Sequence, residues 1–97
     1  MAERPARYPY RAPIDAYGNG GFRFAEMSHR GSILCLPSGI YAWDVRSPAD
    51  LDAKSFAAVL AEARDIGFLL LGTGRTQVFP SQDIRNVFAA AGVGLEP

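Results

Sequence analysis

The stretch from residue 67 to residue 81 constrains the fold more than any other part of the chain. It contains an apolar run, Phe68–Leu71, then a Gly-Thr-Gly-Arg break at positions 72–75, and then a helix start at Ser81. A short apolar run bounded by glycine is typical of a strand that is covered on both faces. We therefore predict a buried strand over residues 68–72 and expect the other elements to cover it.

Helical periodicity appears on both sides of this strand. Asp52 and Ser81 stand where N-caps are expected, and Asp83 falls in the first turn of the second helix. Gly92 stands just after that helix, at the position where glycine commonly ends a helix. A last strand is predicted over residues 93–95. The apolar positions that repeat as i, i+3, i+4 and i+7 are Phe56, Val59, Leu60 and Ala63 in the first helix, and Ile84, Val87, Phe88 and Ala91 in the second.

Short strands with short turns are predicted in the first half of the chain. Asn19-Gly20 is a strong hairpin signal. The predicted strands cover residues 14–17, 22–27, 32–36 and 40–45, and the predicted turns cover 18–21, 28–31 and 37–39.

The element order predicts an α+β (mixed α/β) fold. An antiparallel β meander leads into a β-α-β-α-β run, which implies a layered β/α architecture with a mixed sheet. Residues 1–12 are proline- and arginine-rich and are expected to form a flexible N-terminal arm. Residues 13–97 are expected to form a single α/β domain.

Composition argues against several classes of function. Ten basic and ten acidic residues balance, which disfavours a nucleic-acid-binding protein. A single cysteine and a single histidine cannot build a Cys/His zinc site without carboxylates or a second chain, so we expect no metal and no cofactor. With neither an apolar run of about 20 residues nor a signal peptide, we expect a soluble, cytoplasmic protein without a membrane span.

The Gly-Thr-Gly-Arg break is the first candidate site. Gly72, Thr73, Gly74 and Arg75 follow the predicted strand at its carboxyl end, where open α/β sheets bind ligands. Free amides and a guanidinium there could hold an anion. The alternative is that the glycines only let the chain leave a crowded sheet. The stretch matches neither the P-loop pattern, because no Gly-Lys-Ser/Thr follows, nor the Gly-x-Gly-x-x-Gly pattern, because position 77 is Gln.

The candidate nucleophile is Cys35, with His29 in the preceding predicted turn. A reactive cysteine needs a lowered pKa and access. Cys35 lies between Leu34 and Leu36, so we expect a buried, inert thiol, and no catalytic residues are assigned.

Four aromatic residues occupy consecutive predicted strands at period-two spacing. We expect them to be core, but an uncovered sheet face would turn them into an exposed partner surface. They are Phe22, Phe24, Tyr41 and Trp43.

Several of these motifs together resemble a known family of small proteins of unknown function. The family includes the mitochondrial assembly factor 3 of respiratory complex I, and the resemblance covers about residues 13–96. The segments that carry it are 14–18 (Ile-Asp-Ala-Tyr-Gly), 21–24 (Gly-Phe-Arg-Phe), 31–34 (Gly-Ser-Ile-Leu), Trp43 and 69–74 (Leu-Leu-Leu-Gly-Thr-Gly).

The resemblance implies a layered fold with a mixed sheet, first seen in an archaeal hypothetical protein, and no established catalytic residues. For mitochondrial relatives it implies a protein partner during complex I assembly at the inner membrane. Family members usually continue with a C-terminal helix, so this chain is expected to lack a C-terminal segment.

Two functions follow as expectations. The first is a non-catalytic interaction or assembly module, with a homodimer and a peripheral membrane location left open. The alternative is a small-ligand or anion-binding domain that uses the loop at residues 72–75.

Overall fold

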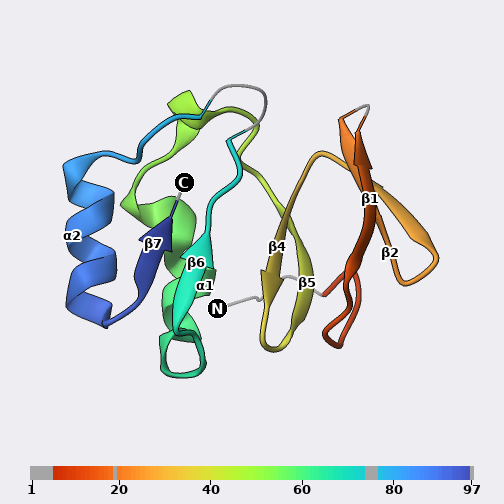
Figure 1. Ribbon diagram of the computed structural model, residues 1–97, viewed down its shortest axis with the longest axis horizontal. Helices are drawn as coiled ribbons and strands as arrows, with labels where there is room; N and C mark the ends of the chain where they lie inside the picture. Colours follow the sequence, from red (N-terminus) through yellow and green to blue (C-terminus); the bar gives the residue numbers. More distant parts are fainter. Residues whose placement is uncertain (1–5, 19, 74–76, 97) are drawn as a thin grey trace. The chain divides into compact units, whose positions relative to one another are not determined.

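The computed structural model describes residues 6–18, 20–73 and 77–96, and the chain forms two compact units. The first unit spans Met1–Arg46 and the second spans Ser47–Pro97. Figure 1 shows that the first unit is built of strands, whereas both α-helices belong to the second.

The first unit consists of a three-stranded antiparallel sheet and a separate hairpin. The sheet has the order β1-β2-β3, and the hairpin pairs β4 with β5 (Figure 1). The bounds are Ile14–Gly18 for β1, Gly21–Phe24 for β2, Met27–Arg30 for β3, Ser32–Leu36 for β4 and Gly39–Trp43 for β5.

The strand β3 occupies a segment predicted as a turn, and this prediction was wrong. The chain reverses earlier, at Ala25 and Glu26, which take positive φ angles of 48° and 62°. Because Phe24 pairs with Met27, only two residues form the loop. Two-residue hairpin loops favour positive φ at both positions, usually with Asn or Gly. The Ala-Glu pair carries no such signal, so this turn could not be predicted from the sequence.

The core of the first unit is formed by alternate residues of its strands. Phe24, Leu34, Leu36 and Ile40 are buried. The segment before β1 joins this unit, because the amide of Tyr8 donates to the carbonyl of Ile40 and the amide of Ile40 donates back to Tyr8. Residues 1–5 of the predicted arm lie outside the described residues.

The second unit contains short helical segments, two α-helices and a pair of parallel strands. β6 and β7 pair in parallel, and α2 lies between them in the chain. The bounds are Pro48–Asp50 for η1, Ala53–Phe56 for η2, Ala57–Ala61 for α1, Ala63–Asp65 for η3, Phe68–Leu70 for β6, Gln82–Ala91 for α2 and Gly94–Glu96 for β7.

The first predicted helix forms in three pieces, η2, α1 and η3. Asp52 caps it as predicted, since its carboxylate accepts from the amide of Ser55 at 2.9 Å and Ser55 Oγ accepts from the amide of Asp52 at 3.1 Å. Phe56 and Glu62 have φ angles of −100° and −109°, away from regular helix geometry. The helical hydrogen bonds therefore change pattern at these two positions.

The second helix, α2, forms as predicted. Ser81 Oγ accepts from the amide of Ile84 at 3.4 Å, and Gly92 ends the helix with a φ of 74°. Phe88 of this helix packs edge-on against Phe56, with ring centroids 5.1 Å apart. This aromatic contact joins the two helical segments in the core of the second unit.

The α+β class is confirmed, but the hydrogen-bonded strands are divided differently from the prediction. In the described residues they form three sheets, of three, two and two strands, instead of one mixed sheet. Spacing along the chain indicates which segments are strands, but it does not encode which strand edges meet. The division of the strands into three sheets was therefore not predicted.

Candidate functional site

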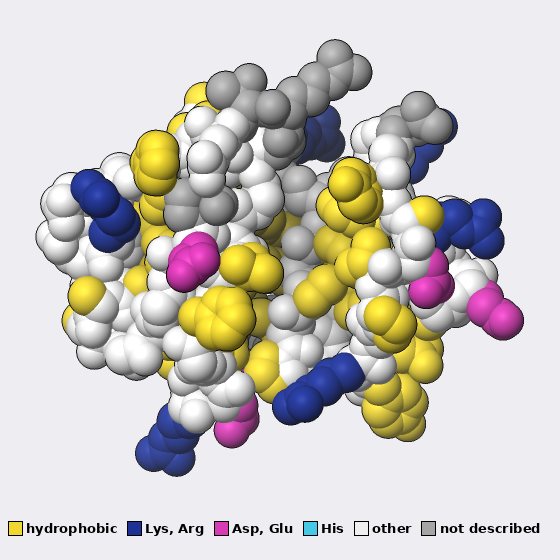
Figure 2. All heavy atoms as spheres, in the orientation of Figure 1, with side chains coloured by type: hydrophobic (Ala, Val, Ile, Leu, Met, Phe, Trp, Pro, Cys, Tyr) yellow, Lys and Arg dark blue, Asp and Glu magenta, His cyan; other side chains and the backbone are white. Residues whose placement is uncertain are grey.

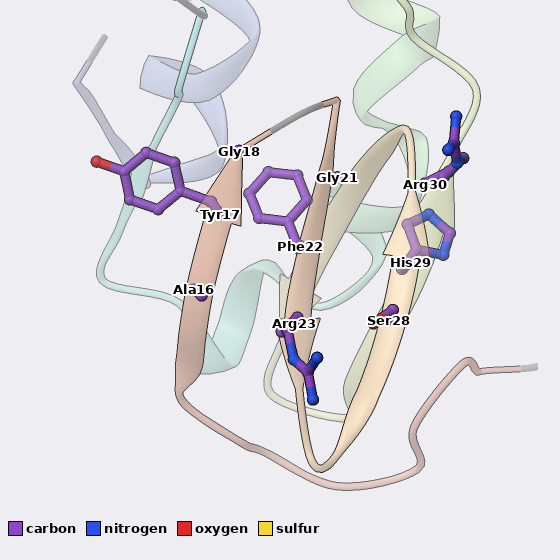
Figure 3. Close-up of a pocket in the computed structure, with 9 residues that line it drawn as sticks. All are labelled: Ala16, Tyr17, Gly18, Gly21, Phe22, Arg23, Ser28, His29 and Arg30. Carbon is purple, nitrogen blue, oxygen red and sulfur yellow. The ribbon is translucent and has the colours of Figure 1, made fainter.

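A hollow of about 330 Å³ lies on the three-stranded sheet of the first unit. Figure 3 shows that its lining comes from all three strands, with Tyr17 and Phe22 on the side of β1 and with His29 and Arg30 on the side of β3. The lining residues are Ala16, Tyr17, Gly18, Gly21, Phe22, Arg23, Ser28, His29 and Arg30.

Strand pairing shows which side chains share a face of this sheet. Ala16 pairs with Arg23, and Arg23 pairs with Ser28, so these three residues form one row across the strands. Gly18, Gly21 and Arg30 form a second row on the same face. We call this face, made of Ala16, Gly18, Gly21, Arg23, Ser28 and Arg30, the outer face.

The outer face is turned away from the core of its unit. Phe24 is fully buried, and alternation along β2 places Arg23 on the opposite side of the sheet. Arg23, Ser28 and Arg30 are all exposed. Small residues thus leave a depression beside two long cationic side chains.

The two arginines on the outer face are free of protein partners within the part of the chain that the structure describes. A third guanidinium lies beside the sheet, because Arg7 Nη2 donates to the backbone carbonyl of Ser28 at 3.4 Å. Sequence reasoning missed this group of residues, since residues 28–31 were predicted as a turn. The Phe-Arg-Phe alternation of β2 was the one visible signal.

His29 serves to link β3 with β4. Its Nε2 lies 3.2 Å from the carbonyl oxygen of Ser32 and donates to it, because a carbonyl can only accept. The half-buried ring pairs with Phe22 and therefore lies on the face opposite Arg23.

Cys35 is exposed, and the prediction of a buried thiol was wrong. β4 turns Leu34 and Leu36 into the core, so alternation directs Cys35 outward. Partial desolvation nevertheless raises the pKa of its thiol above the ordinary value. The thiol is therefore protonated near neutral pH, which is the opposite of what a cysteine nucleophile needs.

The predicted loop site is only partly described. Gly72 is exposed, and Thr73 Oγ1 accepts from the amide of Val78 at 3.0 Å. Gly74 and Arg75 lie outside the described residues. An anion site at this loop stays a prediction.

The strand β6 is not covered on both faces, and that prediction was wrong. Leu71 is buried and Leu69 is half-buried, but Phe68 is 63% exposed and Leu70 is 69% exposed. The strand therefore has one covered face and one open face. Figure 2 shows hydrophobic side chains at the surface over β6.

Residues of β7 complete the open face of the β6-β7 pair. Phe68 pairs with Gly94, and Leu70 pairs with Glu96. A Cβ atom on Gly94 would come 3.1 Å from Cβ of Phe68, which places this glycine directly beside that side chain. We call Phe68, Leu70, Gly94 and Glu96 the β6 face.

The four aromatic residues proposed from sequence are not a single exposed surface. Phe24 is fully buried and belongs to the core, because its face of β2 packs inward. Phe22, Tyr41 and Trp43 are each half-buried.

Neither a metal cluster nor a membrane-crossing helix is found where the chain is described. Residues 6–18, 20–73 and 77–96 contain no group of three or more His, Cys, Asp or Glu side chains placed to hold a metal ion. The helices in these same ranges are too short or too polar to cross a membrane.

Comparison with known proteins gives the family. Residues 14–97 match the family described as a protein of unknown function, DUF498/DUF598. The chain belongs to this family. An uncharacterized protein of Rhodobacter capsulatus is 31% identical over 97 residues, which are 100% of this chain and 73% of that protein.

Solved structures of similar proteins have the same fold. A Bartonella henselae protein, described as an outer membrane protein, is 46% identical, with a TM-score of 0.87 over 93% of this chain and 75% of its own. The Rpa2829 protein of Rhodopseudomonas palustris is 40% identical, with a TM-score of 0.80 over 98% of this chain and 70% of its own.

Proposed function

We propose that this chain is a non-catalytic interaction module that binds a protein partner through the β6 face. The observation that carries the proposal is the exposure of Phe68 and Leu70, which is 63% and 69%. Removing two large apolar side chains on one strand face from water is favourable, and contact with a partner surface would bury them.

Shape and charge on the β6 face favour a protein over a lipid surface. Gly94 has no side chain and lies directly beside Phe68, so the side of the Phe68 ring that faces Gly94 is not covered by a neighbouring side chain at that position. Glu96 places a carboxylate opposite Leu70, and residues 47–97 contain six acidic and four basic side chains. An anionic membrane would be repelled, whereas a protein segment that combines apolar and basic residues complements both features.

The resemblance to the complex I assembly factor suggests the kind of partner. We infer that the partner belongs to a membrane-associated respiratory complex or to its assembly machinery. The family matched above is of unknown function, and the resemblance supports this class of partner. A second copy of the chain, joined through the same face, is the competing occupant.

An anion site at the Gly72–Arg75 loop is the second candidate. The bond from the Val78 amide to Thr73 gives that hydroxyl a structural role, which disfavours it as a ligand group. The β6 face is therefore the stronger candidate.

The experiment is affinity capture from the membrane fraction of the native host, with the 97-residue chain as bait. We would compare the wild type with the double variant Phe68→Ser/Leu70→Ser. Tyr17→Ser is the matched control, because Tyr17 is 83% exposed and lies in the other unit. Sedimentation of the bait alone reports any homodimer.

The proposal predicts that wild type and Tyr17→Ser recover complex I subunits or assembly proteins, and that the double variant loses them. A bait that is folded by circular dichroism yet recovers none of these proteins contradicts it. Equal recovery by the double variant excludes the β6 face as the contact. A dimer that the double variant dissociates identifies a second copy as the occupant instead.

A further inference from the structure

Arg23 and Arg30 place two like charges close together on the outer face. Arg23 pairs with Ser28 and Arg30 pairs with Gly21, so the two arginines are diagonal neighbours on adjacent strands. Diagonal neighbours lie about 7–8 Å apart, within reach of long side chains. Figure 3 shows the two side chains extending in different directions, and because both are exposed, each can swing toward a ligand between them.

Nothing in the described part of the chain neutralises this pair. Neither guanidinium has a hydrogen-bond or ion-pair partner among the described residues. Arg7 adds a third positive charge near the same strand through its bond to the carbonyl of Ser28. Residues 1–46 contain six basic and four acidic side chains, so the unit as a whole also favours an anion.

Small residues give the ligand room beside the arginines. Ala16, Gly18 and Gly21 share the outer face with them, and a Cβ atom on Gly21 would collide with the carbonyl oxygen of His29. Gly21 therefore keeps the floor of the hollow low. The hydroxyl of Ser28, paired with Arg23, adds a neutral donor on the same face.

The size of the hollow and its lining indicate a small organic ligand. Its volume of about 330 Å³ is at the lower end of the range for ligand sites, about 300–1,000 Å³. Tyr17, Phe22 and His29 also border the hollow, although their side chains belong to the opposite face. On the outer face, the methyl group of Ala16, the glycine Cα atoms and the aliphatic stems of the arginines give apolar surface beside the charges. A free inorganic ion would leave that surface unused.

From these observations we propose that the outer face of the β1-β2-β3 sheet binds a small organic anion, with its oxyanion group held between Arg23 and Arg30. The chemical class is an aromatic or aliphatic phosphate monoester or carboxylate. Arginine recognises both groups through charge-assisted, bidentate hydrogen bonds. This site is on a different unit and takes a different ligand from the β6 face, so it is independent of the proposed function.

The test is a calorimetric titration of the 97-residue chain at low ionic strength, where screening is weak. The probes are phenyl phosphate, benzoate and inorganic phosphate. The variants are Arg23→Gln and Arg30→Gln, with Arg64→Gln as the matched control because it removes an exposed arginine of the other unit. All three sites are exposed, so each variant should fold.

We expect wild type and Arg64→Gln to bind phenyl phosphate with equal affinity, and each outer-face variant to bind it about 10-fold more weakly or worse. Tighter binding of phenyl phosphate than of benzoate identifies the phosphate monoester, and the reverse order identifies the carboxylate. No heat of binding at millimolar concentrations of any probe overturns the proposal. So does an equal loss in Arg64→Gln, or inorganic phosphate binding as tightly as the organic probes.

Discussion

The strands β2 and β6 present opposite chemistry to solvent, because β2 has apolar residues at alternate positions whereas β6 is apolar at every position. In β2, Phe24 is fully buried and Arg23 faces outward. In β6, Leu71 follows on the covered face, while Phe68 and Leu70 face outward. The first strand has a charged outer face and the second has an apolar one.

This difference indicates what each surface can recognise. Exposed arginines beside small residues suit a compact anion, because charge and directional hydrogen bonds supply the affinity. Exposed Phe68 and Leu70 suit a protein surface, because burial of apolar area supplies it. An apolar strand therefore indicates burial somewhere, but not necessarily within its own chain.

The largest expected difference between the two strands is in the cost of removing an aromatic ring, which is buried in β2 and exposed in β6. Phe24→Ala should lower the free energy of unfolding by about 3–5 kcal/mol, because it removes a buried ring and leaves a cavity. Phe68→Ala should change it by less than about 1 kcal/mol, since the ring is 63% exposed. Urea denaturation measures both, and equal losses would mean that Phe68 is buried in the folded chain.

A pair of glycine substitutions tests the floor of the outer face. Gly21→Ala should cost about 1–3 kcal/mol, because the new methyl group meets the carbonyl oxygen of His29. Gly67→Ala is the control, since a methyl group there would find open space within 4 Å beyond its chain neighbours. Thermal unfolding of the two variants measures the difference. A neutral Gly21→Ala would show that the backbone of β3 yields to the methyl group and that the floor is not fixed by this contact.

Acid should weaken the start of the second unit. Hydrogen bonds from the Ser55 side chain and backbone lower the pKa of the Asp52 carboxyl below its ordinary value. The charged form is thus favoured by folding, and its contribution is present above the unfolded pKa and lost as pH falls through the folded value. Asp52→Asn keeps a capping side chain but removes the charge, so it serves as the reference.

Urea midpoints measured from neutral pH down to pH of about 2 follow this contribution, since an unperturbed aspartate titrates near about 3.9. Wild type should be more stable than Asp52→Asn at neutral pH, and the gap should close as the pH falls. A gap that widens on acidification would contradict the lowered pKa.

The smallest expected effect concerns Cys35. Its side chain is exposed but the pKa of its thiol is raised, so alkylation should be slower than that of a free thiol at neutral pH and should accelerate in alkaline solution. Cys35→Ser should leave stability almost unchanged. Rapid alkylation at pH of about 7 would indicate a thiolate and revive an enzymatic role, because an unperturbed cysteine has a pKa of about 8.5.

The sequence predicted the helical elements better than the strands. Ser81, Gly92 and Asp52 announce helix ends through local chemistry, and the structure places all three as caps. The turn at Ala25-Glu26 has no such signal, because its positive φ angles are imposed by pairing of β2 with β3. Because this turn was not predicted, the pairing of Arg23 with Ser28 across β2 and β3 was not predicted either.

The exposure of β6 could not be predicted for a different reason. Periodicity reports which residues are apolar, but the covering of each face depends on which elements pack there. Phe68 and Leu69 are both large and apolar, so their sequence does not distinguish a covered position from an exposed one. Their exposure differs because they lie on opposite sides of the strand. The sequence therefore predicted the strand β6 but not its exposed face.

Photo-crosslinking in the native host's membrane fraction tests the central claim most directly. A photoreactive residue replaces Leu70 in one bait and Tyr17 in another, and both positions are exposed in the free chain. The account predicts crosslinks to complex I subunits or assembly proteins from position 70 and none from position 17. Equal crosslinking from both positions, or none from position 70 in a folded bait, would contradict the assignment of the β6 face as the partner surface.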